Sequence, residues 1–154
     1  MVTPKVPPDA GTFENMISSM NKIGGEPRAT VLITHLYIEY LLDWILRREI
    51  EKPDKIIKRG FASKLELVDS FDIIFPNLMH DLWIVNEIRN QFAHNIDIES
   101  QDFMKEFAEK LGRMEYFKNK RHSNKVPTYN AYMMVMMQIY ALLKNRFDSL
   151  PSES

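Results

Sequence analysis

Helical periodicity runs through most of this chain and limits it to an all-helical fold. Near the amino terminus, apolar residues recur at positions i, i+3, i+4 and i+7, and near the carboxyl terminus they again follow one helix face. The first set is Phe13, Met16, Ile17 and Met20, and the last is Tyr132, Met136, Ile139 and Leu143. No segment alternates convincingly as a strand does, and residues 71–75 are the only short candidate.

Prolines, glycines and capping residues divide this pattern into separate helices. The expected helices cover residues 13–23, Pro27 to about Ile50, a short stretch from Pro53, Ser63 to Phe71, Asn77 to Ala93, a segment capped by Ser100, and Thr128 to about Phe147. Ser63 and Glu66 have the spacing of a capping box, and Pro76 starts the helix expected over 77–93. The prediction is an all-α bundle of about six helices around two long antiparallel core helices. We expect one domain over residues 12–148, with flexible tails at 1–11 and 149–154.

Composition places the chain among soluble globular proteins. Of its 154 residues, 45% are apolar and 27% are charged, and the formal net charge is −1. That charge argues against a global basic field for duplex DNA. No cysteine is present, so disulfides and thiolate metal sites are excluded. Without a secretory signal or 18 uninterrupted apolar residues, we expect a cytoplasmic protein that does not span a membrane.

A polar motif ends the helix expected over 77–93, within the segment Ile88–His94. Arg89 offers a fork of donors for a phosphate, and His94 can move a proton near neutral pH. On a regular helix Arg89 lies in the apolar arc, and about 140° separates it from His94. The two side chains converge on one ligand only if the helix end unwinds or a second chain brings its own pair.

An arginine on an apolar face requires a partner, because an unpaired buried charge costs several kcal/mol. Glu39 is an acid on the apolar stripe of the helix that begins at Pro27. The sequence therefore predicts an ion pair between Glu39 and Arg89, with Asp43 as the second choice. In the structural alternative, this pair only fixes helix packing, and His94 interacts favourably with the helix dipole.

Three segments resemble the mannitol operon repressor (MltR) family, which is itself similar to the HEPN superfamily of helical domains. They are Arg28–Ile33, Glu39–Leu42 and Ile88–His94, and the resemblance covers roughly Pro27 to Asn95. In active HEPN members it implies metal-independent RNA cleavage across a dimer, which leaves a cyclic phosphate. Arg89 would then hold the scissile phosphate, Asn90 would be the polar residue after it, and His94 would be the general acid or base.

The family name implies a different role, the repression of a sugar-alcohol operon. No helix-turn-helix with basic recognition residues is evident in the sequence, so a repressor of this type would act through a protein partner. The first hypothesis is therefore an MltR-like regulatory or interaction module, and the alternative is a HEPN-type endoribonuclease. Both imply a homodimer, with RNA or a regulatory protein as the partner, and no cofactor.

Weaker candidates lie elsewhere in the chain. A basic segment beside Tyr116 and Phe117 can steer a phosphate backbone, although such a run is more often a solvated connection. Its residues are Lys118, Lys120, Arg121, His122 and Lys125. Four methionines between 133 and 137 suit a core or a dimer seam. His35, His80 and His94 do not have the spacing of helical metal ligands, so we predict no metal site.

Overall fold

The computed structural model describes residues 13–23, 26–118 and 128–151, and within these ranges the chain is helical without strands. The helices are α1 (Phe13–Ile23), α2 (Pro27–Glu49), α3 (Asp54–Ile57), α4 (Phe61–Ser70), α5 (Pro76–His94), α6 (Gln101–Gly112), α7 (Glu115–Lys118) and α8 (Thr128–Ser149). The all-α prediction is confirmed. Six of these described helices have ten residues or more, as expected. The four-residue helix α3 is the short stretch expected from Pro53, and α7, also of four residues, is additional.

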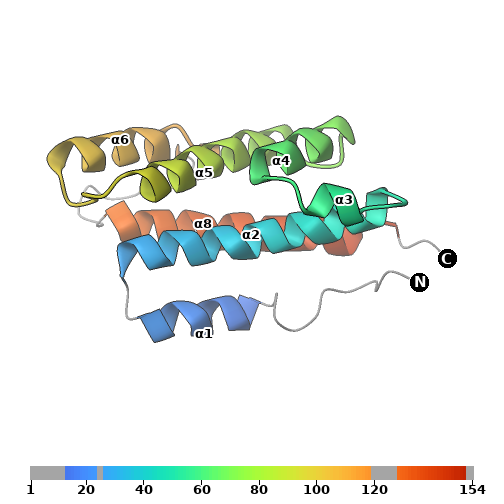
Figure 1. Ribbon diagram of the computed structural model, residues 1–154, viewed down its shortest axis with the longest axis horizontal. Helices are drawn as coiled ribbons and strands as arrows, with labels where there is room; N and C mark the ends of the chain where they lie inside the picture. The colour runs from blue at the N-terminus through green and yellow to red at the C-terminus, as the bar shows by residue number, and fades with distance from the viewer. Residues whose placement is uncertain (1–12, 24–25, 119–127, 152–154) are drawn as a thin grey trace.

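Three long helices, rather than the two we expected, form the core. The central helix α2 contacts α1, α3, α4, α5 and α8. In Figure 1, α1 lies along one side of α2, whereas α4, α5 and α6 form a layer on the other. Contacts at the helix ends show that α5 runs antiparallel to α2 and that α8 runs parallel to it. Near the carboxyl end of α5, the side chain of Phe92 is fully buried.

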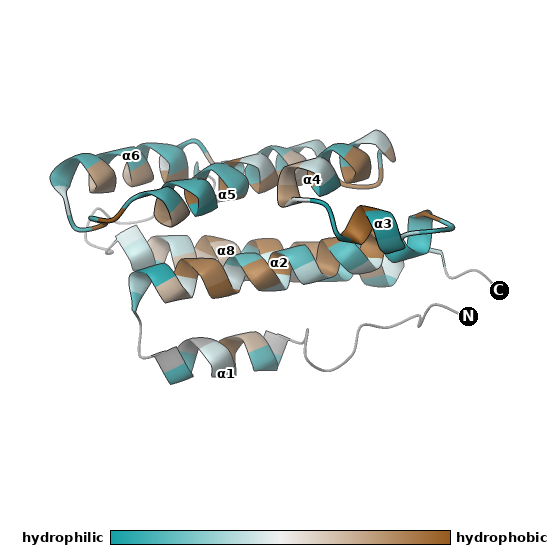
Figure 2. Ribbon diagram, viewed as in Figure 1, coloured by the Kyte–Doolittle hydropathy of each residue, from teal (hydrophilic) through white to brown (hydrophobic). Residues whose placement is uncertain are grey.

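Aromatic packing fixes the carboxyl half of α5 against α6 and α8. The ring of Phe92 lies 4.8 Å from that of Phe103, 5.1 Å from that of Phe107 and 6.0 Å from that of Tyr129, all edge to face. Such pairs are favourable beyond the area that they bury. Figure 2 shows hydrophobic residues repeated along α2 and α8, and more hydrophilic residues along the outer helix α6.

Local signals predicted some helix ends correctly and others wrongly. Ser100 caps α6 as expected, accepting a hydrogen bond from the amide of Phe103 at 3.1 Å. The capping box expected at Ser63 does not form, since α4 begins two residues earlier with Gly60 at its amino-terminal cap. Residues 71–75 are not a strand, because the chain turns there with a positive φ of 55° at Asp72.

Three arginines tie distant segments together by donating to main-chain carbonyls. Arg28 donates to the carbonyls of residues 95 and 96, just after α5, at 2.6 and 3.0 Å. Arg48 donates to those of Phe147 and Leu150, at 2.8 and 3.3 Å. Arg146 donates to the carbonyl of Ile73. Leu150, whose carbonyl accepts from Arg48, is only 6% exposed. The packed part of the chain therefore extends beyond residue 148, where we expected the domain to end.

Helix α2 is long and apolar enough to cross a membrane by length and composition alone, the only such helix among the described residues. Half of its most apolar window is nevertheless buried inside the structure. Its position at the centre of the bundle explains this composition, since a helix surrounded by others carries apolar residues on most of its faces. The structure is therefore compatible with a soluble protein.

Candidate functional site

The predicted motif lies at the carboxyl end of α5, where its apolar members face inward and its polar members reach the surface. Ile88 and Phe92 are fully buried. Arg89 is half-buried, whereas Asn90 and His94 are exposed. The Arg89 guanidinium donates one long hydrogen bond, of 3.4 Å, to the side-chain oxygen of Asn90. The buried positions thus fix the helix, and the polar positions remain accessible.

The end of α5 does not unwind before His94. The helix continues through that residue, and the backbone becomes extended only at Asn95. Five residues of regular helix turn the direction of a side chain by about 140°. Of the two routes by which Arg89 and His94 could converge on one ligand, only the contribution of a second chain is left.

The predicted ion pair between Glu39 and Arg89 is wrong, because a lysine from a different helix occupies that place. The ammonium of Lys64, on α4, lies 2.8 Å from Glu39 Oε1 and 2.8 Å from Asp43 Oδ1. Its side chain is only 3% exposed. Helix α4 packs against α2 and delivers this charge to two acids one turn apart. Among the described residues, the ion pairs do not include Arg89.

Electrostatics within the Lys64 cluster, which comprises Lys64, Glu39 and Asp43, favours a charged ammonium. Burial alone would lower the pKa of Lys64, but hydrogen bonds and charges from Asp43 and Glu39 outweigh it and raise the pKa. Burial raises the pKa of Asp43, and Lys64 opposes that shift. Two carboxylates hold the single ammonium of Lys64, so the cluster stabilises the contact between α2 and α4.

His35 extends this cluster towards the motif. Its side chain is 3% exposed, its ring centroid lies 4.2 Å from that of Phe61, and its Nδ1 lies 3.9 Å from Glu39 Oε2. Burial lowers the pKa of His35 to about 4; Glu39 opposes the shift, and the charges of Arg89 and Lys64 add to it. Arg89 is therefore near enough to influence His35 electrostatically, although it makes no ion pair with Glu39.

Two further contacts hold the end of α5 in place. Gln91, 6% exposed, donates to the carbonyl of Phe103 at 2.9 Å and accepts a hydrogen bond from the ammonium of Lys110 at 2.9 Å. The side-chain amide of Asn95 donates to the carbonyl of Gln91 at 2.6 Å. Together with Arg28, these contacts fix the backbone on both sides of His94.

The sequence carries a signal for Lys64 that a comparison of α2 with α5 alone overlooks. Lys64 stands between Phe61 and Val68 on the buried stripe of α4, just as Arg89 stands on that of α5. A lysine in such a position requires acidic partners, because a buried charge without them is costly. If every helix is searched for a cation on its apolar stripe, both Lys64 and Arg89 are candidates for the acidic partner Glu39.

Only the beginning of the basic segment lies within the described residues. Lys118 ends α7, is 53% exposed, and lies 3.8 Å from Glu115. Lys120, Arg121 and Lys125 lie outside the described residues. Of the four methionines, Met136 is buried in the core and Met134 is 46% exposed.

With this geometry, the motif can contact a phosphate through Arg89 and exchange a proton through His94, but at separate places on the surface. The side chains of Asn90 and His94 are exposed to solvent at this end of α5. Comparisons with family models, with curated proteins and with solved structures find no match to this chain.

Proposed function

We propose that this chain is an MltR-like regulatory module that acts by binding a partner at the carboxyl end of α5. The observation that carries the proposal is the regular helix through His94, which keeps Arg89 and His94 apart. Catalysis would need a phosphate-holding group and a proton-transfer group on one ligand. Binding needs only that each group be accessible and well positioned, as both are in a single protomer.

The surface beside the motif supports a protein partner. Ile96, two residues after His94, is 97% exposed. Its backbone carbonyl accepts a hydrogen bond from Arg28, so an apolar side chain projects from a fixed segment two residues after His94. A preorganised apolar side chain among polar groups is typical of a protein-binding surface, because little conformational entropy is lost on binding. We propose a regulatory protein or a second copy of this chain as the partner.

The second candidate is a metal-independent HEPN-type endoribonuclease, assembled from two protomers. One observation favours it: Lys64, rather than Arg89, neutralises Glu39. A guanidinium without a carboxylate partner among the described residues is available for a scissile phosphate. In a homodimer, Arg89 of one protomer and His94 of the other would supply the two functions that one protomer keeps apart.

A cleavage assay distinguishes the two candidates. Purified protein is incubated with a mixed, labelled RNA pool in EDTA, beside His94→Ala and the matched control Arg59→Ala, at an exposed arginine near α3. The regulatory proposal expects no cleavage by any of the three. Cleavage by the wild-type protein and by Arg59→Ala, but not by His94→Ala, would establish the nuclease and overturn the regulatory proposal.

A transcript measurement tests the regulatory role directly. Deleting the gene in its host should raise the transcript of the host's mannitol operon, and the intact gene should restore repression. We expect Ile96→Asp to fail in this complementation while an exposed change remote from the motif, Lys58→Asp, succeeds. Unchanged transcript after deletion would rule out repression of that operon.

A further inference from the structure

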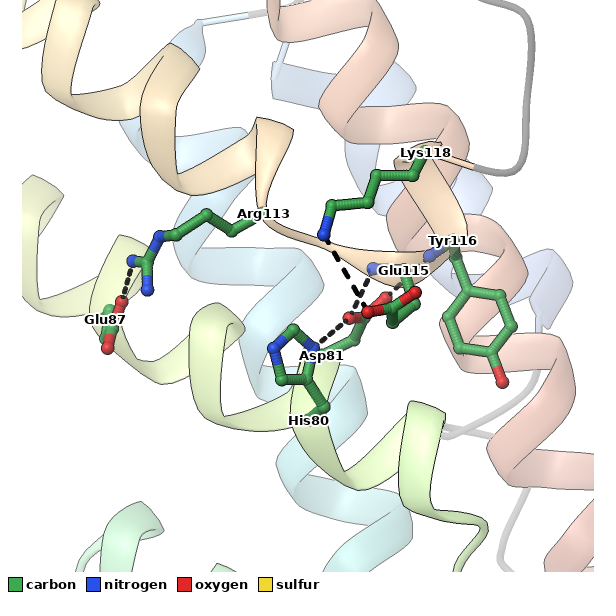
Figure 3. A network of polar contacts seen from close by, with 7 residues as sticks. All are labelled: His80, Asp81, Glu87, Arg113, Glu115, Tyr116 and Lys118. Carbon is green, nitrogen blue, oxygen red and sulfur yellow. Dashed lines mark hydrogen bonds and ion pairs between the residues drawn. The ribbon is translucent and has the colours of Figure 1, made fainter.

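A second histidine, distant from the predicted motif, is held by a buried acid. His80 lies in the first half of α5, and Asp81 beside it has no exposed surface. The Nδ1 atom of His80 lies 3.0 Å from Asp81 Oδ1. Figure 3 shows the other ring nitrogen of His80 directed away from Asp81. The pair places one imidazole nitrogen against a carboxylate and leaves the other accessible, since His80 is 48% exposed.

Asp81 is rigidly positioned by its other contacts. Its Oδ1 accepts a hydrogen bond from the amide of Glu115 at 2.7 Å, and its Oδ2 accepts one from the amide of Tyr116 at 2.9 Å. Asp81 thus caps the first turn of α7 from α5 (Figure 3). A side chain fixed at both oxygens cannot rotate to follow its neighbour, so it holds the imidazole in one orientation.

The contact with Asp81 also sets the tautomer of His80. A carboxylate only accepts hydrogen bonds, so Nδ1 carries the proton and Nε2 carries the lone pair. The acid stabilises the positive charge that develops on the ring when Nε2 forms a bond. These are the properties of a nucleophilic imidazole.

We propose that His80 is a phosphoryl-acceptor site for donors of the phosphoramidate and acyl phosphate class. The lone pair of Nε2 attacks phosphorus, a nitrogen–phosphorus bond forms, and the donor's bond to phosphorus breaks. The leaving group departs with the bonding pair, as ammonia from phosphoramidate. The proton on Nδ1 stays on the ring, against Asp81.

Charged groups around the pair suit a covalent phosphoryl group better than a free phosphate ion. Arg113 is already paired with Glu87, and Lys118 lies 3.8 Å from Glu115 (Figure 3). The acids balance the cations, so the surface has little excess positive charge with which to collect anions. The 3.8 Å contact is loose, however, and Lys118 is 53% exposed, so Glu115 holds its ammonium only weakly.

The other histidines of the chain serve as controls for the reactivity of His80. His94 is exposed, like His80, but no acid among the described residues holds it, and His35 is only 3% exposed. An accessible histidine reacts slowly with phosphoramidate in any protein, so the proposal predicts a difference in rate. His80 should be phosphorylated at least about tenfold faster than His94, because its tautomer and orientation are fixed.

The experiment incubates the full chain with phosphoramidate at neutral pH and follows each histidine by phosphorus NMR and by peptide mass spectrometry under non-acidic conditions. His80→Gln should lose the fast reaction, and His94→Gln should retain it. Asp81→Asn should slow it by about tenfold or more. Circular dichroism checks that each variant folds, and His80→Gln alone decides the site if Asp81→Asn does not fold. Equal rates at His80 and His94, label only at another histidine, or no label would overturn the proposal.

Discussion

The Lys64 cluster and the motif at the end of α5 both place charges in helices of the core, but they treat those charges differently. Lys64 is 3% exposed and has two carboxylates at 2.8 Å. Arg89 is half-buried and donates a 3.4 Å hydrogen bond to Asn90. A charge fully matched within the fold serves stability, whereas a charge without an acid partner is available for other molecules.

The largest effect should come from removing the charge of the Lys64 cluster. Lys64→Ala leaves Glu39 and Asp43 facing each other without a cation, and we expect a loss of about 3 kcal/mol in the free energy of unfolding. Urea denaturation measures it, with Lys58→Ala on the exposed side of the chain as the control. A loss no larger than that of the control would show that the cluster does not hold α2 against α4.

Low pH should reduce the free energy of unfolding through His35, which lies between the Lys64 cluster and the motif at the end of α5. Its pKa is about 4 in the folded protein, against an ordinary value near 6.5. Because the unfolded chain takes up this proton first, stability should fall as the pH is lowered from about 6.5 to about 4, by up to roughly 3 kcal/mol. The raised pKa of Asp43 acts in the opposite direction.

Comparison with His35→Gln isolates this contribution, because the variant retains Asp43 and Glu39 but lacks the titrating ring. Urea denaturation at a series of pH values should give a steeper decline for the wild-type protein than for the variant. Parallel profiles would mean that His35 is protonated in the folded protein as easily as in the unfolded chain.

A smaller effect is expected where Arg28 fixes the end of the motif helix. Arg28→Ala removes two hydrogen bonds to carbonyls after α5. Since the contact is exposed, we expect a loss of about 1 kcal/mol in unfolding free energy, and a smaller loss for Arg28→Lys. The NMR chemical shifts of the His94 ring should change in Arg28→Ala. Unchanged shifts would show that Arg28 does not position this residue.

The smallest effect should come from Arg89 itself. Arg89→Ala should change the unfolding free energy by no more than about 0.5 kcal/mol, because the guanidinium lacks an acid partner among the described residues. The same urea measurement used for Lys64→Ala gives the comparison. A loss as large as that of Lys64→Ala would erase the distinction between the two regions and make Arg89 a structural residue.

The fold was predictable because local signals along most of the chain agree. Pro27 and Pro76 begin α2 and α5 as expected, and Ser100 caps α6. The partner of Glu39 was not predictable from one helix, because it depends on how α4 docks against α2. Likewise, Asp81 looks like one more polar residue of α5, and only the position of α7 gives it a role.

The contact from Arg28 to the carbonyls after α5 means that this helix end is not an independent terminus. Arg28 leaves from the first turn of α2, so fraying of α5 must also release the beginning of α2. The two ends therefore open as one cooperative unit. A partner that pulls on the loop at Ile96 acts on both helices at once, and the energy of opening is shared between segments 67 residues apart.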